Sequence, residues 1–86
     1  MHAALPEVTF YFKDGCDLCE CVEQELQDFI ERKGTQFPFK LNKADIEDSR
    51  DWFDLYHLKV PVICVDGREV FHYHFDEDKL MAALQC

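Results

Sequence analysis

The chain has 86 residues, of which 48% are hydrophobic and 14% aromatic, and 18 acidic against 9 basic side chains give a net charge of −9. This length favours one domain, residues 1–86, and the composition excludes an intrinsically disordered chain. The acidic balance argues against nucleic acid and against an anionic membrane surface as partners.

Targeting signals and cysteine usage indicate the cellular compartment in which the protein is expected. No apolar run approaches the roughly 20 residues of a membrane span, and the N-terminus lacks the pattern of a signal peptide. Five cysteines form no regular framework, which argues against a disulfide-stapled secreted domain. We therefore expect a cytoplasmic protein, and we expect it to be monomeric.

The first half of the chain predicts a strand, a helix and a second strand. Glu7 to Phe12 is a nearly continuous apolar run, typical of a strand buried on both faces. From Asp17 to Lys33 the apolar residues recur at helical spacing, and Gly34 ends this helix. The inward stripe comprises Cys19, Val22, Leu26, Phe29 and Ile30.

The second strand is predicted from Thr35 to Leu41, and Pro38 within it favours the edge of a sheet. Strand, helix and strand in about 35 residues predict a parallel pair with a right-handed crossover. A short helix should follow from Ser49 to Tyr56. We expect its apolar side chains to pack inward, namely Trp52, Phe53, Leu55 and Tyr56.

The last third of the chain predicts a β-hairpin and a closing helix. Val60 to Val65 and Arg68 to Tyr73 are rich in β-forming residues and flank Asp66-Gly67, a strong hairpin signal. A helix from Asp76 to Leu84, capped by Asp76, then closes the order β-α-β-α-β-β-α.

The motif with the clearest chemical meaning is Cys16-Asp17-Leu18-Cys19 at the start of the first helix. Residues three apart on a helix have Cβ atoms about 5–6 Å apart, and bridged cysteines need about 3.5–4.5 Å, so small adjustments would join the two sulfurs. Free N–H groups at a helix start also favour a thiolate at Cys16. Because a loop this short would stabilise the fold by only roughly 2 kcal/mol, redox chemistry explains the pair better than stapling.

With these elements in place, the chain resembles the thioredoxin fold, and within it a small glutaredoxin-like family of bacterial proteins. The resemblance extends from Val8 to Leu84 and is carried by the stretches Phe12–Cys19, Lys59–Val62 and Val65–Glu69. It implies an α/β, thioredoxin-like chain with a four-stranded mixed sheet flanked by three helices. It also implies a thiol–disulfide oxidoreductase that acts on a disulfide-containing protein or a small thiol.

The resemblance also implies roles for single residues. Cys16 corresponds to the nucleophile and Cys19 to the resolving thiol. Pro61 corresponds to a cis proline that faces the dithiol, and Val60 would offer its backbone to an extended substrate by strand addition. Lys13 corresponds to a lysine that helps to hold a glutathione carboxylate.

The chain departs from the glutaredoxin pattern at three places. Leu18 stands where an aromatic residue is usual, Lys59 stands where threonine is usual, and Phe71–His74 replaces a Gly-Gly pair that lets the backbone approach glutathione. The missing glycines argue against glutathione as a co-substrate. No tightly bound cofactor is implied.

Other cysteine and histidine residues allow an alternative interpretation, metal or cluster binding. Cys21 extends the motif to C-x-x-C-x-C, but on a helix it points about 140–160° away from both other cysteines, which favours an exposed spectator thiol. His72 and His74 are two apart on a predicted strand and could share a metal. Cys64 is expected to be a buried inert thiol, and Cys86 a terminal one.

The main alternative to thiol–disulfide exchange, ahead of metal binding, is a thioredoxin-fold interaction module whose cysteines are redox-silent or serve as a sensor. Docking of a basic partner would then fall to the acidic residues of the middle segment, which otherwise form a solvated face: Asp45, Asp48, Asp51 and Asp54.

Overall fold

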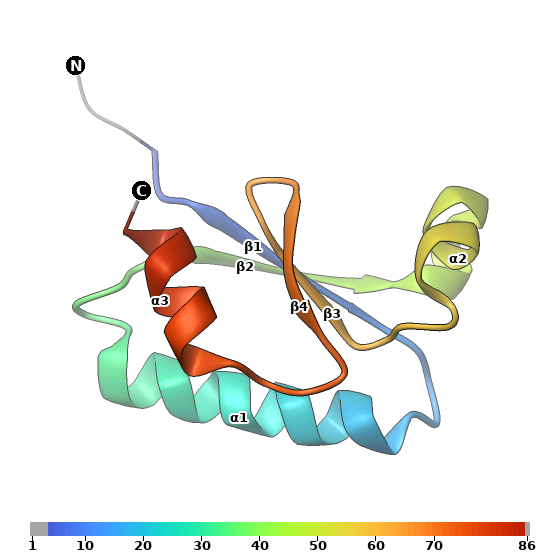
Figure 1. The fold of residues 1–86 in the computed structure, drawn as a ribbon, viewed down its shortest axis with the longest axis horizontal. Coiled ribbons are helices and arrows are strands. Elements are labelled where there is room, and N and C mark those ends of the chain that lie inside the picture. Colours follow the sequence, from blue (N-terminus) through green and yellow to red (C-terminus); the bar gives the residue numbers. More distant parts are fainter. Residues whose placement is uncertain (1–3, 86) are drawn as a thin grey trace.

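The computed structural model describes residues 4–85. The predicted order of elements is confirmed, with one additional short 3₁₀ helix (Figure 1). The elements are β1 (Glu7–Phe12), α1 (Asp17–Lys33), β2 (Lys40–Asp45), η1 (Ile46–Asp48), α2 (Arg50–Tyr56), β3 (Val62–Val65), β4 (Arg68–His72) and α3 (Glu77–Leu84). None of the helices within residues 4–85 is long and apolar enough to cross a lipid bilayer.

The four strands form one mixed sheet in the order β2-β1-β3-β4. β1 pairs with β2 in parallel, as the βαβ pattern predicts, and β3 is antiparallel to both of its neighbours. Tyr11 lies opposite Val62, and Val62 lies opposite His72. The end of β1, the beginning of β3 and the end of β4 therefore meet at one end of the sheet.

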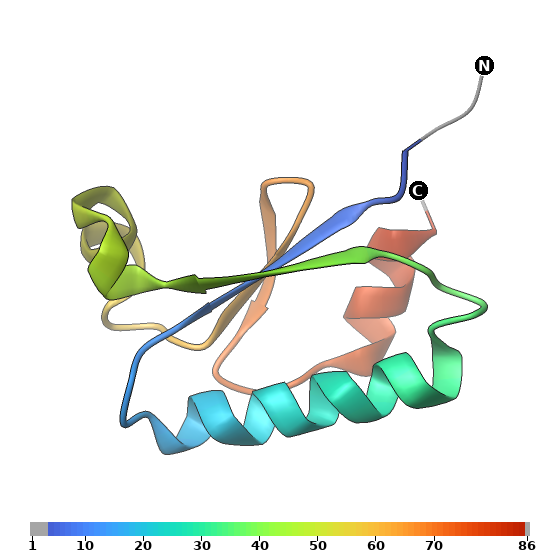
Figure 2. The same cartoon turned by 180° about the vertical axis from the view of Figure 1, so that it is seen from behind.

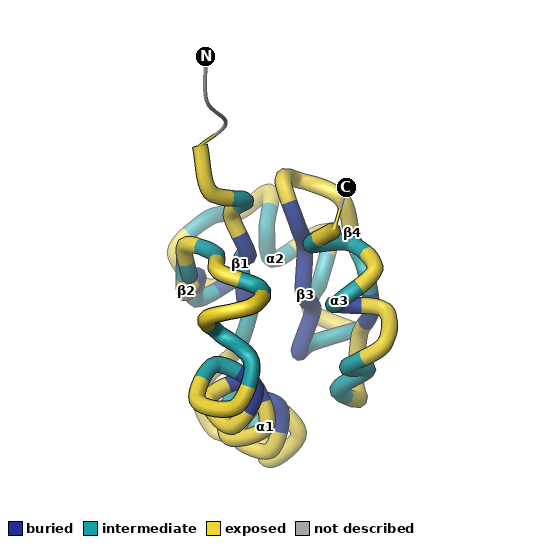
Figure 3. Tube along the Cα trace, turned by 90° about the vertical axis from the view of Figure 1, so that its left-hand side faces the viewer, coloured by how far each residue is buried: buried dark blue, intermediate teal, exposed yellow. Residues whose placement is uncertain are grey.

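The two faces of the sheet carry different helices. Phe10 and Ile63 belong to one core cluster with residues of α1 and α3, so both of these helices cover the same face. Tyr11 and Cys64 alternate with them along the strands and contact Tyr56 of α2 from the other face. Figure 3 shows that β3 is buried along its length and that the buried side of α1 faces the strands.

The predicted second strand is wrong in its position. β2 begins at Lys40 rather than Thr35, because the chain first makes a turn in which the Phe37 N–H donates to the Lys33 carbonyl at 2.8 Å. Pro38, which has no N–H to donate, lies in that connection and not in the strand. The predicted edge position is confirmed, and Figure 2 shows β2 as an outer strand leading toward α2.

The expectation that α2 packs inward is also wrong for most of its length. None of its residues is buried, and Leu55 is 62% exposed. Trp52 and Tyr56 are half-buried against the ring of Tyr11, with ring centroids 5.7 and 4.5 Å away. Figure 1 shows α2 at the far end of the sheet from α3, where few strand residues are available to cover it.

Local signals at the other boundaries are confirmed. Ser49 caps α2 and Asp76 caps α3, each accepting a hydrogen bond from the backbone three residues on. Asp66 and Gly67 both have positive φ, 50° and 86°, as a tight two-residue hairpin turn requires.

The stability of the α1 face should depend on Phe29. This side chain is fully buried and its ring lies 6.2–6.4 Å from the rings of Phe37, Phe39 and Phe75. We expect Phe29→Ala to lower the free energy of unfolding in urea by about 3–5 kcal/mol, because the cavity cannot close on three large rings. The exposed Gln27→Ala in the same helix should change it by less than about 0.5 kcal/mol. Equal effects of the two substitutions would contradict this view of the core.

Candidate active site

The start of α1 is organised by the thiol of Cys16. The chain leaves β1 through Lys13, Asp14 and Gly15, and Gly15 has a φ of 74°, which favours glycine. Cys16 is the N-cap residue, and its Sγ accepts a hydrogen bond from the Cys19 N–H at 3.1 Å. The capping position usually belongs to a side-chain oxygen, and here a nucleophilic sulfur occupies it.

The second thiol of the motif has a different environment. Cys19 is only 4% exposed, as its place on the apolar stripe predicts. Burial, and next a hydrogen bond with the Cys16 thiol, raise the pKa of Cys19 to about 12, while a backbone hydrogen bond from Lys13 acts in the opposite direction. Both thiols are unbridged, and Cys19 is protonated at neutral pH.

A small pocket lies beside the two sulfurs, with a volume of about 200 Å³. It is lined by the aromatic side chains of Phe10 and Phe12, by segment 13–15, by both cysteines, and by two glutamates one and two turns along α1. Three of the predicted site residues therefore meet here: Lys13, Cys16 and Cys19.

Val60 and Pro61 approach from the neighbouring strand. The peptide bond between them is cis, and Pro61 immediately precedes Val62, which pairs with Tyr11 at the end of β1. They therefore lie at the same end of the sheet as the dithiol, although they do not line its pocket. Within residues 4–85 the Val60 N–H and C=O make no hydrogen bond, so both groups are available to a partner.

The structure adds residues that sequence reasoning missed, and they brace the segment before β3. Lys59 forms an ion pair with Glu69 at 2.6 Å, and Glu69 also contacts His72 Nδ1 at 3.0 Å. These contacts, with Lys59 as the largest contribution, lower the pKa of the Glu69 carboxyl. The Tyr73 hydroxyl donates to the Leu58 carbonyl at 2.5 Å. The one available signal was Lys59 itself, an unusual charge beside the Val-Pro pair.

Tyr73 lies in the segment that stands in place of the Gly-Gly pair, and its backbone conformation is unusual. Its φ is 68°, a conformation that costs a non-glycine residue about 1–2 kcal/mol. Its N–H donates to the Pro61 carbonyl at 2.9 Å, and together with the phenol this ties the end of β4 to the segment 58–61.

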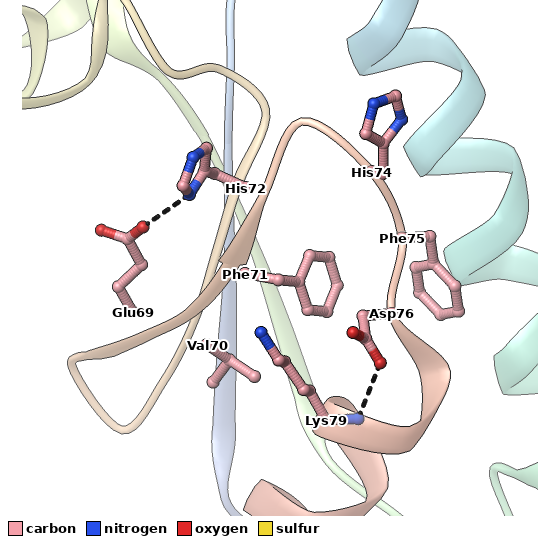
Figure 4. Close-up of a pocket in the computed structure, with 8 residues that line it drawn as sticks. All are labelled: Glu69, Val70, Phe71, His72, His74, Phe75, Asp76 and Lys79. Carbon is pink, nitrogen blue, oxygen red and sulfur yellow. Dashed lines mark hydrogen bonds and ion pairs between the residues drawn. The ribbon is translucent and has the colours of Figure 1, made fainter.

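The histidine pair does not form the metal site considered above. β4 ends at His72, and the positive φ of Tyr73 turns the chain, so His72 points toward Glu69 while His74 lies beside α1 (Figure 4). The pocket drawn there lies between β4 and α3. Across residues 4–85 no three His, Cys, Asp or Glu side chains are grouped to hold a metal ion.

Cys21 and Cys64 are the other two cysteines within residues 4–85. Cys21 is exposed on α1, as predicted. Cys64 is 2% exposed on the α2 face of the sheet, with its sulfur 3.9 Å from the Tyr56 hydroxyl, and burial raises its pKa. Cys86 lies outside the described residues.

The different environments of the two motif cysteines predict different alkylation rates. At pH 8, iodoacetamide should modify Cys16 at least about 100-fold faster than Cys19, because a pKa three units above the ordinary value makes the Cys19 thiolate roughly 1,000-fold rarer. Peptide mass spectrometry over time measures both rates. In guanidinium chloride the rates should converge, and equal rates in the folded protein would contradict the burial of Cys19.

The brace through Tyr73 can be tested by hydrogen exchange. Tyr73→Phe removes the hydrogen bond to the Leu58 carbonyl, and the neighbouring Lys59 N–H, which donates to the Tyr56 carbonyl, should exchange about three- to tenfold faster. Tyr11→Phe is the control, since the Tyr11 hydroxyl has no hydrogen bond within residues 4–85. An unchanged exchange rate in Tyr73→Phe would show that the phenol does not hold this segment.

Comparison with known proteins places this geometry in a family. A "Glutaredoxin-like protein YDR286C homolog" of Dictyostelium discoideum is 29% identical over 80 residues, which cover 91% of this chain and 74% of that protein. The solution structure of protein Ne2328 from Nitrosomonas europaea is 25% identical, with a TM-score of 0.73 and coverage of 95% and 94% of the two chains.

Thioredoxins share the fold at lower identity. Oxidized mitochondrial thioredoxin 3 from Saccharomyces cerevisiae is 15% identical, with a TM-score of 0.65, and 93% of this chain and 76% of that one are covered. The thioredoxin-like α/β fold expected from the sequence is thereby confirmed. The family model of the Glutaredoxin-like domain (DUF836) matches residues 7–85, and the chain belongs to this glutaredoxin-like family.

Proposed function

We propose that the chain is a thiol–disulfide oxidoreductase in which Cys16 is the nucleophile and Cys19 the resolving thiol. The observation that carries this proposal is the pairing of a helix-capping thiol with a buried, protonated one in hydrogen-bond contact with it. Free N–H groups at the start of α1 stabilise negative charge on the capping sulfur. The redox character of the family supports the same chemistry.

The proposed exchange has two steps. The Cys16 thiolate attacks one sulfur of a substrate disulfide, forms a mixed disulfide and releases the other sulfur as a thiolate, which takes a proton from solvent. Cys19 then loses its proton and attacks the Cys16 sulfur. The substrate gains two electrons and leaves as two thiols, while the protein is left with a Cys16–Cys19 disulfide. No tightly bound cofactor is needed.

The proposed substrate contact is an extended chain beside Val60. The unpaired N–H and C=O of this residue are suited to one step of strand addition, in which main-chain hydrogen bonds hold the peptide next to the dithiol. Pro61 would complete that surface. A disulfide in a protein or peptide therefore suits the site better than a disulfide without a backbone.

Glutathione is a weaker candidate. Lys13 makes no ion pair with residues 4–85 and could meet one of its carboxylates. However, segment 72–74 carries the side chains of two histidines and Tyr73 where close backbone approach would need glycines. We propose glutathione only as an alternative reductant of the oxidised pair.

The proposal predicts distinct phenotypes for three cysteine substitutions. Cys16→Ser should abolish reduction of a peptide disulfide, and Cys19→Ser should accumulate a mixed disulfide that mass spectrometry detects, because nothing then attacks the Cys16–substrate bond. Cys21→Ser, an exposed thiol on the same helix, is the matched control and should retain the wild-type rate.

Titration of the wild-type protein against defined redox buffers is the second measurement. A reversible two-thiol couple between about −300 and −150 mV supports exchange. A pair that stays reduced across this range, together with wild-type rates in Cys16→Ser, would overturn the proposal in favour of a redox-silent interaction module.

A further inference from the structure

The pocket beside Cys16 and Cys19 is lined by more negative than positive side chains. Lys13, Asp14, Glu20 and Glu23 all line it. Glu23 is paired with Lys43 of β2, whose amine also lies 5.6 Å from the centroid of the Phe12 ring, so this carboxylate is neutralised. Asp14 and Glu20 form no ion pair within residues 4–85.

A third carboxylate adds negative charge near the two cysteines. Asp17 lies between the two cysteines in the first turn of α1, is exposed and is likewise unpaired within residues 4–85. The Glu20 carboxylate is close enough to Cys19 to contribute to the raised pKa of that thiol. Two unpaired carboxylates, Asp14 and Glu20, therefore line the pocket beside the sulfurs, and Lys13 is the unpaired cation that lines it.

These charges matter because of how a disulfide must approach. Its sulfur has to contact Cys16, so groups a few bonds from that sulfur come within about 10 Å of the carboxylates, which is about one Debye length at 0.1 M salt. At an exposed site one such pair changes an equilibrium or rate by about two- to fivefold. Several such charge pairs acting together would make the protein react faster with cationic than with anionic disulfides.

We propose that the pocket beside Cys16 selects disulfides flanked by positive charge, and that Asp14 and Glu20 are specificity-determining residues for basic peptide or protein substrates. This inference rests on the proposed function. The acceptor is a peptide with lysine or arginine near its disulfide, and the unpaired backbone of Val60 lies at the same end of the sheet to receive it. Oxidised glutathione, an anion, is disfavoured by the same charges.

The test compares three small disulfides in single turnovers of the pre-reduced protein. Cystamine is a dication, oxidised glutathione a net anion, and bis(2-hydroxyethyl) disulfide is neutral. Each rate is divided by the rate of the same disulfide with dithiothreitol at the same salt concentration, because the three leaving thiols differ in reactivity. Each disulfide consumes one Cys16–Cys19 dithiol and releases two thiols, so no added reductant is needed. At 20 mM salt we expect cystamine to react at least about tenfold faster than oxidised glutathione, and the ratio to fall severalfold at 0.5 M salt.

The variants then assign the effect to named residues. Asp14→Asn combined with Glu20→Gln should reduce the cystamine-to-glutathione ratio at least about fivefold. The matched control is Glu25→Gln combined with Asp28→Asn, which removes the same charge from exposed positions of α1 that do not line the pocket. This control should keep the wild-type ratio.

The outcomes separate the inference from the proposed function. If all three disulfides are reduced at rates within twofold of each other, or if both double variants change the ratio equally, the charge selection is wrong while the exchange activity stands. If neither these three disulfides nor a peptide disulfide is reduced, the proposed function itself falls. A peptide disulfide flanked by lysines, compared with the same peptide carrying glutamates, extends the measurement to the proposed substrate class and should show the same preference.

Discussion

One hydrogen bond underlies the arrangement of the site, the donation of the Cys19 N–H to Cys16 Sγ at the first turn of α1. It satisfies a backbone group that the helix geometry leaves without a partner, and it holds the Cys16 sulfur at the first turn of the helix. The same contact therefore starts the helix and orients the Cys16 thiol. It requires a sharp turn after β1, which the positive φ of Gly15 allows.

The fold makes the two motif cysteines unequal although they are three residues apart. Cys16 lies before the first helical residue and remains partly accessible, whereas Cys19 faces the core with Val22 and Leu26. Burial disfavours the charged form of a thiol, so the second sulfur is protonated at neutral pH. Cys64 shows the contrast, because it is equally buried but lies on the α2 face of the sheet, away from the dithiol.

Periodicity and turn chemistry were sufficient to predict β1, α1, the Asp66-Gly67 hairpin and α3, because these elements show strong apolar patterns or caps. β2 was misplaced because its sequence, Lys40 to Asp45, is largely polar and pairs through backbone contacts with β1. The inward packing expected of α2 failed because exposure depends on where the sheet ends, which no local pattern encodes. The dithiol was predictable from spacing, but the contact of Glu69 with Lys59 was not. It depends on strand register, which shifts between Ile63 and Cys64.

The likeness to thioredoxins indicates where substrate specificity can reside in such a small chain. Thioredoxins 15% identical to this protein share its fold, so the fold alone cannot distinguish one substrate from another. The features of this chain that can bias the choice of substrate lie around the dithiol: the loop held by Tyr73, and carboxylates that have no cationic partner within residues 4–85. Unpaired carboxylates beside Cys16 repel anionic groups that approach its sulfur. If the same carboxylates attract a cationic substrate, they lower the free energy of its encounter with Cys16. This attraction would explain why they lie beside that residue.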